Sequence, residues 1–338
     1  MSGIGIAVVG TGYIGCEHMK AIAAHQKAEL KVICSTQRSR DQALGLMKAH
    51  GAGRVSVDYR DVVEDAEVQI VYLCTPNSQH VEQAVMALEA GKHVFVEKPL
   101  AVTVPECERI VAAARPAPGL LIVGHGARFS KIFVALHRLI QDGTLGEACF
   151  VEGDYVHDLG PFLDLPGHDW WLDAENEGQL PIIGGACHPL DLMRWIAGEI
   201  VEVSAFGTNR NIPAAPWCDT VIANLKFASG ALGKCLVSCG AKIPYAMNFG
   251  YYGTKGSVLN DRLFLDGIPH AEGFMRLPVE IRTEDHTCAE QLDHFLDTIE
   301  TGKKPLIDAV DGARSVAVCC AVAESIGVGR SVAVQLDF

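Results

Sequence analysis

The sequence predicts a parallel α/β domain followed by an α+β domain whose sheet is open-faced and mostly antiparallel. At 338 residues the chain is too long for one typical domain and long enough for two cores. Up to about residue 125, short apolar runs alternate with amphipathic helical stretches. Beyond that point, strand-like segments follow one another across short turns. We therefore expect two domains, at residues 1–125 and 126–338.

Buried strands are the first elements of the N-terminal part. They are the runs IGIAVV, LKVICS, VQIVYLC, HVFVE and LLIVGH. These runs are nearly all apolar, as strands covered on both faces must be. The stretches between them predict helices that end near Lys27, span about 39–50 and span about 79–90. This alternation predicts a parallel sheet with helices on its faces.

The C-terminal part begins with a helix over about 130–142 and the turn DGTLGE. The strand-like segments that follow are ACFVEGDYV, VEVSAFGT, TVIANLKF, GALGKCLVSC, MNFGYYG and GSVLN. Glycine-containing turns between them favour antiparallel pairing. Further helices are predicted over about 188–196, 286–301 and 311–326, all within the second domain.

Composition excludes several classes of partner. A formal net charge of -13 without a basic run argues against nucleic acid. The apolar stretches are too short or too interrupted to span a membrane, and the N-terminus has no basic region of an export signal. Twelve cysteines without a C-x-x-C pair indicate small buried side chains in a reducing cytoplasm rather than disulfides or a zinc site. We expect a cytoplasmic protein without a bound metal.

The first strand runs directly into a glycine motif, Gly10-Thr11-Gly12-Tyr13-Ile14-Gly15, that opens a helix. In this position Gly10 permits a tight turn, Gly12 lets a pyrophosphate approach the backbone, and Gly15 allows close helix packing. Such a string is weak evidence alone, but its place at the start of a β-α-β pattern predicts a dinucleotide-binding Rossmann domain.

The end of the second strand bears on the choice of cofactor. Domains that prefer NAD usually carry an acidic residue there for the ribose hydroxyl. Here the strand is followed by Ser35, Thr36 and then Arg38, with no carboxylate. Two hydroxyls and a guanidinium suit a 2′-phosphate, which favours NADP over NAD. The alternative is that Arg38 is simply a solvated residue at the start of a helix.

Two further strand ends carry the most specific motifs, CTPNSQH (74–80) and Glu97-Lys98-Pro99. Together with GTGYIG, AGKHVFVEKPLA, RLIQDGTLGE, GTKGSV and HFLDTIETGKKP, they make the chain resemble the Gfo/Idh/MocA family of oxidoreductases over essentially its whole length. That family includes glucose-fructose oxidoreductase and inositol dehydrogenases. The resemblance implies a nicotinamide cofactor and a sugar-like substrate.

The resemblance also implies roles for individual residues at these strand ends. Thr75, Pro76, Asn77 and His80 would line the nicotinamide end of the cofactor cleft, and Glu97 would lie near the ribose. Lys98 would touch both the nicotinamide ribose and the substrate. A lysine in that place can exchange a proton with the alcohol oxygen as hydride leaves the carbon.

The family's third landmark is a glycine-rich run, an aspartate, a histidine four residues later and an aspartate three further on. The match is GQLPIIGGACHPLD (178–191), with His188 and Asp191 in the implied positions and Gly184 in place of the first aspartate. His188 would then share acid-base work with Lys98, unless it only stabilises its own helix. The sequence cannot choose a replacement carboxylate; the candidates are Asp191, Asp158, Asp173 and Glu175.

Aromatic and imidazole groups complete the implied substrate site. Tyr155 and His157 end the first strand of the second domain, and Trp171 precedes the glycine run. Aromatic faces suit the C–H faces of a sugar ring, although a loop tryptophan is as often packing or an oligomer contact. With Lys98, His188 and Asp191 they form the expected substrate-binding set.

The resulting hypothesis is NAD(P)-dependent oxidation or reduction at a secondary alcohol or ketone of a sugar, sugar derivative or cyclitol. Two alternatives stay open: a redox-neutral enzyme that cleaves a glycoside or eliminates a group through transiently reduced cofactor, and a non-catalytic cofactor-binding regulator. Because the second-domain sheet should have an open face, we also expect a homodimer or homotetramer.

Overall fold

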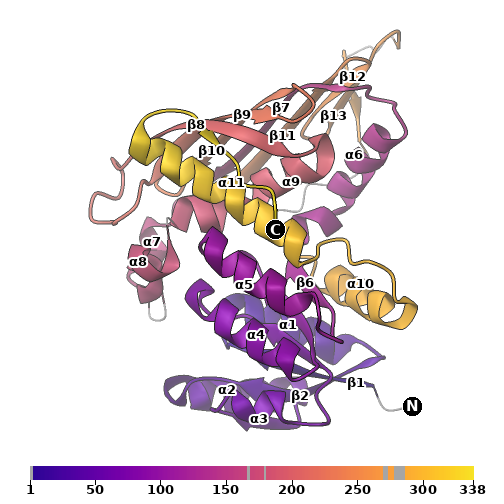
Figure 1. Cartoon of the computed structure of the whole chain (residues 1–338), viewed down its shortest axis with the longest axis vertical. Coiled ribbons are helices and arrows are strands. Elements are labelled where there is room, and N and C mark those ends of the chain that lie inside the picture. Colours follow the sequence, from indigo (N-terminus) through magenta and orange to yellow (C-terminus); the bar gives the residue numbers. More distant parts are fainter. Residues whose placement is uncertain (1–2, 166–167, 179, 269–272, 278–285) are drawn as a thin grey trace. The chain divides into compact units, whose positions relative to one another are not determined.

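The computed structural model describes residues 3–338 except 166–167, 179, 269–272 and 278–285 (Figure 1). The chain divides into two compact units. The first unit comprises residues 1–126, 286–313 and 338, and the second comprises 127–285 and 314–337. Residues 286–313, which the sequence division assigned to the second domain, therefore cluster with the first.

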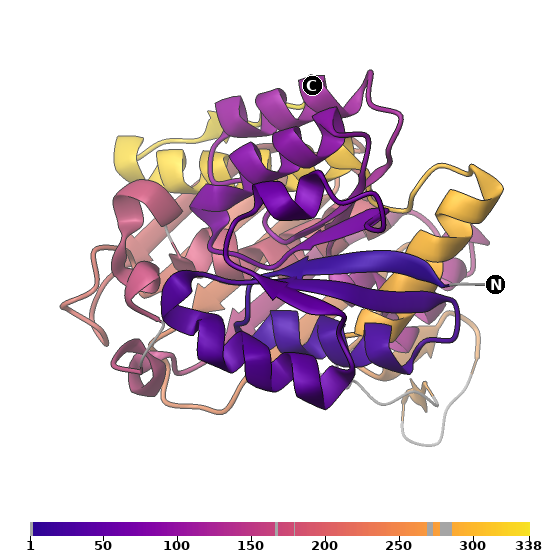
Figure 2. The same cartoon turned by 90° about the horizontal axis from the view of Figure 1, so that it is seen from below.

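The first unit contains a sheet of six parallel strands in the order β3-β2-β1-β4-β5-β6. Its strands are β1 (Ile4–Val9), β2 (Ala28–Cys34), β3 (Arg54–Ser56), β4 (Ile70–Leu73), β5 (His93–Glu97) and β6 (Leu121–Gly124). Its complete helices are α1 (Tyr13–Ala24), α2 (Arg40–His50), α3 (Arg60–Val63), α4 (His80–Glu89), α5 (Val104–Ala114) and α10 (Cys288–Thr301). Helices lie on both faces of the sheet (Figure 2), which confirms the predicted Rossmann architecture.

The strands of this sheet are buried because their side chains are apolar on both faces. Tyr72 of β4 and Phe95 of β5 stack at 4.4 Å between ring centroids and are fully buried. Leu292 and Phe295 of α10 belong to the same core. The C-terminal helix α10 is thus part of the first unit because its apolar face packs there.

The second unit is built on a sheet of nine strands in the order β14-β13-β12-β11-β7-β10-β9-β8-β15. The strands are β7 (Ala148–Val156), β8 (Ile200–Thr208), β9 (Thr220–Phe227), β10 (Leu232–Ser238), β11 (Ala246–Gly253), β12 (Gly256–Leu259), β13 (Arg262–Leu265), β14 (Met275–Arg276) and β15 (Val332–Ala333). Among the strand pairs of the described residues, β10 with β7 is parallel and the others in this sheet are antiparallel. The expected mostly antiparallel sheet is confirmed.

The helices and short turns of the second unit position its candidate site. They are α6 (Lys131–Gln141), α7 (Gly160–Leu163), a 3-10 turn at Asp169–Leu172, α8 (Ala174–Glu177), a π-helical segment at Pro181–Ala186 and α9 (Cys187–Ala197). The long helix α11 (Ala309–Val328) begins in the first unit and continues in the second. No helix among the described residues is long and apolar enough to cross a membrane.

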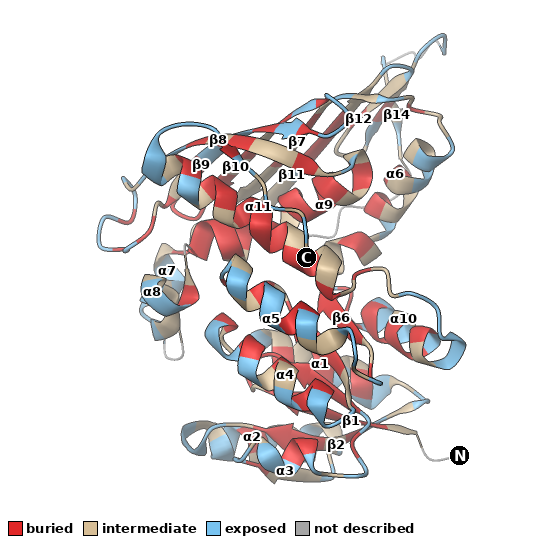
Figure 3. Cartoon of the chain, in the orientation of Figure 1, coloured by how far each residue is buried: buried red, intermediate tan, exposed pale blue. Residues whose placement is uncertain are grey.

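The strands of the second-unit sheet carry buried, intermediate and exposed residues (Figure 3). Along β9 buried and exposed residues alternate, as expected when one face packs on helices and the other does not. On the less buried face Phe206 of β8 lies directly opposite Ile222 of β9, and their exposed fractions are 76% and 48%. This is the open face expected from the sequence.

Candidate cofactor and substrate sites

The glycine loop after β1 has the geometry that a dinucleotide phosphate requires. Gly10 has φ of 107°, and a Cβ there would lie 2.3 Å from the carbonyl oxygen of Cys74. A Cβ at Gly15 would lie 2.4 Å from the carbonyl oxygen of Gly10. At Gly12, by contrast, a Cβ would meet no described protein atom within 4 Å. The protein's own packing thus explains two of the glycines, and close approach of a ligand to the N-terminus of α1 explains the third.

Neighbouring side chains hold this loop in place. The Nε2 of Gln42 in α2 donates a hydrogen bond of 2.9 Å to the carbonyl oxygen of Thr11. The side chain of Ile14 is half-buried and packs against the apolar core. Tyr13 is 67% exposed, and its ring meets His286 edge to face at 5.3 Å between centroids. No motif marks His286 as a neighbour of this loop, because it lies 273 positions from Tyr13 in the chain.

At the end of β2, hydroxyl groups stand where many such domains carry a carboxylate. Thr36 caps a 3-10 turn, and its Oγ1 lies 2.7 Å from the Oγ of Ser39. Ser35 is half-buried, whereas Arg38 is exposed and forms no hydrogen bond or ion pair with the rest of the described chain. This edge therefore offers hydroxyls and one guanidinium to a ligand.

The loop after β4 is fixed by its own histidine. His80 is buried, with Nδ1 2.9 Å from the carbonyl oxygen of Pro99 and Nε2 3.1 Å from that of Thr75. Burial lowers the pKa of His80, although both carbonyl contacts oppose that shift. Its ring therefore joins the β4 and β5 loops, and we assign it to positioning them rather than to the cofactor contact expected from the sequence.

Three other residues of the β4 loop were expected at the cofactor site. The Oγ1 of Thr75 donates to the Oε1 of Gln83 at 2.7 Å, and the buried Asn77 begins a short 3-10 turn capped by Pro76. Because β4 lies between β1 and β5 in the sheet, the ends of these strands share one edge. The loops that carry Gly12, Asn77 and Lys98 therefore meet at the carboxyl edge of the sheet.

The β5 strand ends at Glu97, and the half-buried Lys98 follows it before a cis peptide bond to Pro99. The Glu97 carboxylate is buried: its Oε1 lies 2.8 Å from the Nε2 of His18, and its Oε2 accepts the Lys98 backbone N–H at 3.1 Å. Both oxygens of this carboxylate thus contact protein groups, and the expectation that Glu97 lies near the ribose stays a prediction. We therefore assign Glu97 to holding the strand end.

In the second unit, the rings of His188, Tyr155, Tyr245 and His157 form a chain of successive contacts. The ring of Tyr155 lies parallel to that of His188 at 5.8 Å between centroids. Tyr245 meets Tyr155 at 5.1 Å and His157 at 5.6 Å, both edge to face. Burial raises the pKa of Tyr155 well above its ordinary value, so its hydroxyl stays a donor. Tyr245 was missed because nothing in its local sequence marks it.

Trp171 belongs to a different cluster. Its ring meets His168 at 4.4 Å, and its backbone carbonyl accepts a hydrogen bond of 2.8 Å from the Nε1 of Trp217. These contacts favour the packing role that the sequence left open. Among the described residues, the ring of Trp171 contacts those of His168 and Trp170 and not those of Tyr155, Tyr245 or His188.

The glycine that replaces the family aspartate lies in the π-helical segment just before α9. A Cβ at Gly184 would meet only Leu180 within 4 Å among described residues, with the Cδ1 at 3.1 Å. His188 lies in the first turn of α9, directly after this segment. A π-helical turn is often found at a functional site. A small side-chain shift would admit a larger residue at Gly184.

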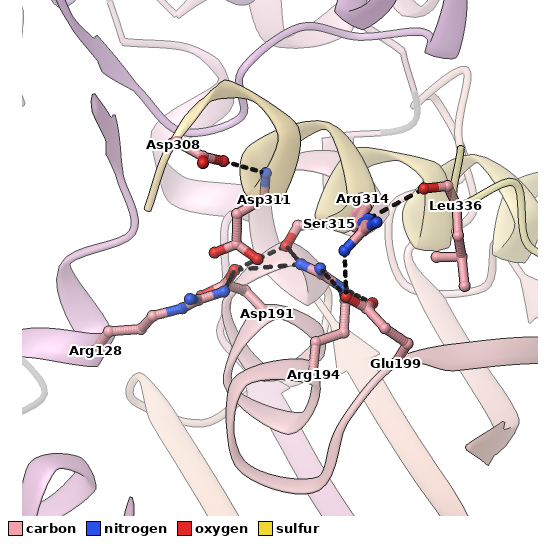
Figure 4. Close-up of polar contacts among 9 residues, drawn as sticks. All are labelled: Arg128, Asp191, Arg194, Glu199, Asp308, Asp311, Arg314, Ser315 and Leu336. Carbon is pink, nitrogen blue, oxygen red and sulfur yellow. Dashed lines mark hydrogen bonds and ion pairs between the residues drawn. The ribbon is translucent and has the colours of Figure 1, made fainter. Parts of the chain in front are cut away.

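Asp191 is buried in an ion-pair network (Figure 4). Its two oxygens accept hydrogen bonds from the Nε and Nη2 of Arg128, at 2.8 and 2.6 Å, and its Oδ1 also accepts one from Ser315 at 2.7 Å. Arg194 joins Ser315 to Glu199, and Glu199 also binds Arg314. The expectation that Asp191 contacts substrate is therefore not supported, because its acceptors are occupied by partners that fix α9.

The other candidate carboxylates are also engaged or exposed. Asp158 binds the Nζ of Lys242 through both oxygens at 3.0 Å, and Asp173 caps α8 by accepting from the Asn176 backbone N–H at 3.2 Å. Glu175 is exposed. No described group of three or more His, Cys, Asp and Glu side chains could hold a metal ion. All twelve cysteines are free, and Cys149 is exposed rather than buried as expected.

Comparisons with known proteins agree with the fold and with the strand-end motifs. Residues 4–125 match the model of the oxidoreductase family with an NAD-binding Rossmann fold, and residues 133–259 match the GFO/IDH/MocA C-terminal domain. Myo-inositol 2-dehydrogenase of Thermotoga maritima is 27% identical over 98% of each chain. The scyllo-inositol 2-dehydrogenase (NAD(+)) of Bacillus subtilis is 27% identical over 98% of this chain and 96% of its own.

A solved structure shares the same architecture. Levoglucosan dehydrogenase in complex with NADH and L-sorbose has a TM-score of 0.90, with 24% identity over 100% of both chains, and this likeness shows the fold. The two family models together span most of the chain, and they match the two sheets described above. The chain therefore belongs to the Gfo/Idh/MocA family of NAD-binding oxidoreductases.

Proposed function

We propose that the protein is an NAD(P)-dependent dehydrogenase that acts on a secondary alcohol or ketone of a sugar, sugar derivative or cyclitol. One observation carries the proposal: the phosphate-type loop at Gly12 and the lysine at the end of β5 occupy one edge of one sheet. A dinucleotide bound along that edge would extend from α1 toward Lys98. Relatives named as inositol dehydrogenases support the substrate class.

Lys98 and His188 are the acid-base groups of this proposal. The bound nicotinamide supplies hydride acceptance or donation. During oxidation the neutral amine of Lys98 takes the alcohol proton and becomes an ammonium group, and during reduction that ammonium group returns the proton to the oxygen. His188 holds or relays that proton on the substrate side, with its ring plane set by the parallel ring of Tyr155.

The substrate surface of the second unit consists of aromatic groups and imidazoles. The ring of Tyr245 contacts those of Tyr155 and His157, at 5.1 and 5.6 Å between centroids. Such a surface suits the C–H faces of a sugar or cyclitol ring. The phenol oxygens and the imidazole nitrogens would bind its hydroxyl groups. Asp191 acts through the placement of α9, and Trp171 has a packing role.

For the cofactor we propose a preference for NADP over NAD. The support is the hydroxyl of Ser35, the capped Thr36 turn and the exposed Arg38 at the end of β2. A carboxylate there would repel a 2′-phosphate, whereas a guanidinium binds it.

The proposal is tested by initial-rate assays of the purified protein with a panel of monosaccharides, anhydrosugars and inositols, each with NAD and with NADP. Stoichiometric reduction of the added cofactor supports a dehydrogenase. Cleavage of a glycoside with catalytic cofactor would instead show the redox-neutral alternative. Cofactor binding without turnover of any member of the panel would point to a non-catalytic regulator.

Gly184 refines the expected substrate size. Because glycine adds space and no proton chemistry, we favour a pocket shaped for substrates larger than a free monosaccharide. Gly184→Asp should lower the rate on larger glycosides by about tenfold relative to free monosaccharides. The measurement is the ratio of kcat/KM values for the two substrate groups. Robust wild-type activity on small sugars without a preference for larger ones would count against this view.

We further propose that the protein forms a homodimer or homotetramer through the open face of the second-unit sheet, in the cytoplasm. The opposed pair Phe206 and Ile222 provides exposed apolar area, and Leu232 of β10 adds a side chain that is 58% exposed. Light scattering of wild type and Ile222→Glu measures this directly. A monomeric wild type would refute the interface.

A further inference from the structure

We propose that His18, in the helix that follows the glycine loop, is a positioning residue for Lys98 and acts through the Glu97 carboxylate. The inference rests on the proposed acid-base role of Lys98. His18 does not contact the substrate in this scheme. It fixes the strand end from which Lys98 extends.

The contact between His18 and Glu97 is short and buried from solvent. The Nε2 of His18 lies 2.8 Å from the Oε1 of Glu97, and the two side chains are 1% and 8% exposed. The rings of Tyr72 and Phe95 lie against the imidazole at 5.1 and 4.9 Å between centroids. The ring therefore has one orientation, and its Nε2 points at the carboxylate.

The second oxygen of Glu97 continues the connection to Lys98. The Oε2 accepts the Lys98 backbone N–H at 3.1 Å. The neighbouring strand leaves room for the carboxylate, because a Cβ at Gly124 would lie 3.1 Å from the Oε1 of Glu97 and 2.9 Å from the Phe95 ring. An unbroken path of polar contacts thus runs from α1 through Glu97 to the backbone of Lys98.

The carboxylate in this path stays ionised although it is buried. Burial alone would raise the pKa of Glu97, but the hydrogen bond from His18 and the electrostatic effects of His18 and Lys98 outweigh it and lower the pKa. An ionised carboxylate accepts stronger hydrogen bonds than a neutral one. The backbone of Lys98 is therefore held by a charge-assisted contact that depends on His18.

A role in packing alone does not account for His18. Its Nδ1 has no hydrogen-bond partner among the described residues, and an unsatisfied buried nitrogen costs stability. An apolar side chain of similar volume would avoid that cost but would leave Glu97 buried without its partner. The imidazole thus provides a hydrogen-bond donor directed at Glu97, which an apolar side chain of similar volume would not provide.

This placement predicts where the effect of a substitution should appear. His18 lies in α1 beyond the phosphate-facing turn, and its polar contact is directed to the end of β5. Misplacement of a reacting group by about 1 Å costs roughly 100-fold in rate. We therefore expect loss of the contact to lower kcat far more than it weakens the cofactor.

The experiment compares His18→Met, which removes the donor, with His18→Gln, whose amide N–H can reach the carboxylate. Met19→Leu, a fully buried neighbour on α1 without a polar role, is the matched control for packing. We measure kcat, KM, the cofactor Kd by fluorescence, and Tm. His18→Met should lower kcat by about 10- to 100-fold with the Kd within about threefold, and His18→Gln should recover most of that loss.

Glu97→Gln tests the same path at the carboxylate instead of the imidazole. It provides the test of the inference if His18→Met does not fold. Alone it should lower kcat by about tenfold with the cofactor Kd within about threefold, and combined with His18→Met its loss should be non-additive, because both changes break one contact. Additive losses, or a His18→Met protein with kcat within threefold of wild type, would overturn the inference. If Lys98→Met were also fully active, the proposed function itself would fail; an inactive Lys98→Met beside an active His18→Met would refute the role of His18 alone.

Discussion

The loop after β4 in the first unit and helix α9 in the second are held by contacts of different range. In the first, His80 binds carbonyl groups 5 and 19 positions away. In the second, Asp191 binds Arg128 and Ser315, which are 63 and 124 positions away. Partners that lie close together in the chain appear in the sequence as one motif, whereas the partners of a long-range contact appear as separate, isolated residues. The comparison explains why one site could be described from motifs and the other needed the folded chain.

The sharpest test of the first unit is Lys98→Met, which roughly keeps the stem and removes the transferable proton. We expect kcat to fall by about 100- to 10,000-fold, as for loss of a general acid-base group, and cofactor binding to stay within about tenfold. Steady-state kinetics on the best substrate and fluorescence titration of the cofactor provide the two readings. If Lys98→Met kept more than about a tenth of the wild-type kcat, Lys98 would not be the acid-base group.

The matching test of the second unit is Arg128→Met, which leaves the Asp191 carboxylate buried without its main partner. Breaking one side of a buried pair costs about 3 to 5 kcal/mol of unfolding free energy. Urea unfolding measures that loss, with Lys242→Met as the control because its ion pair with Asp158 is exposed. If the two variants lost equal stability, the network would not anchor α9 as described.

These two sites also show what the sequence could establish. The Rossmann sheet, the antiparallel sheet and the strand-end motifs were predictable, because apolar runs and glycine spacing are local. The edge strand β3 was missed since Arg54–Ser56 is only three residues long and partly exposed. Strands β14 and β15, with two residues each, were missed for the same reason, and β13 was also missed.

Side-chain partners were much harder to predict than elements. Glu97 and Asp191 were expected to meet ligands, yet both carboxylates are occupied by protein groups. Neither His18 nor Arg128 stands near its partner in the sequence, so no spacing rule could reveal the pairs. A motif identifies a residue as important, but only its contacts distinguish binding from positioning.

An effect of intermediate size is expected for a substitution at the end of β2. Ser35→Asp should weaken NADP by like-charge repulsion and favour NAD, with about a tenfold change in the ratio of their Kd values. Isothermal titration of both cofactors with wild type and variant gives that ratio. An unchanged ratio, or a wild type that already binds NAD much more tightly, would show that β2 does not carry a 2′-phosphate site.

The smallest effect that we predict concerns pH and the loop histidine. Because burial lowers the pKa of His80, the unfolded chain takes up a proton near pH 6.5 before the folded chain does, so stability falls as pH drops from 7 to 5. His80→Gln should reduce that slope by on the order of 1 kcal/mol or less. Chemical unfolding at several pH values compares the two proteins. Parallel stability curves would mean that other histidines account for the slope.

The discontinuity of the first unit has a consequence for how this protein is made. Phe295 of α10 lies 6.3 Å from Tyr72 and 6.4 Å from Phe95 between ring centroids, and Leu292 belongs to the same core. The ribosome completes residues 1–126 well before it reaches α10, an interval on the order of ten seconds or more. During that interval the nascent sheet exposes an aromatic surface that α10 later covers. The newborn chain should therefore be a client of ribosome-associated chaperones until the C-terminal segment is synthesised.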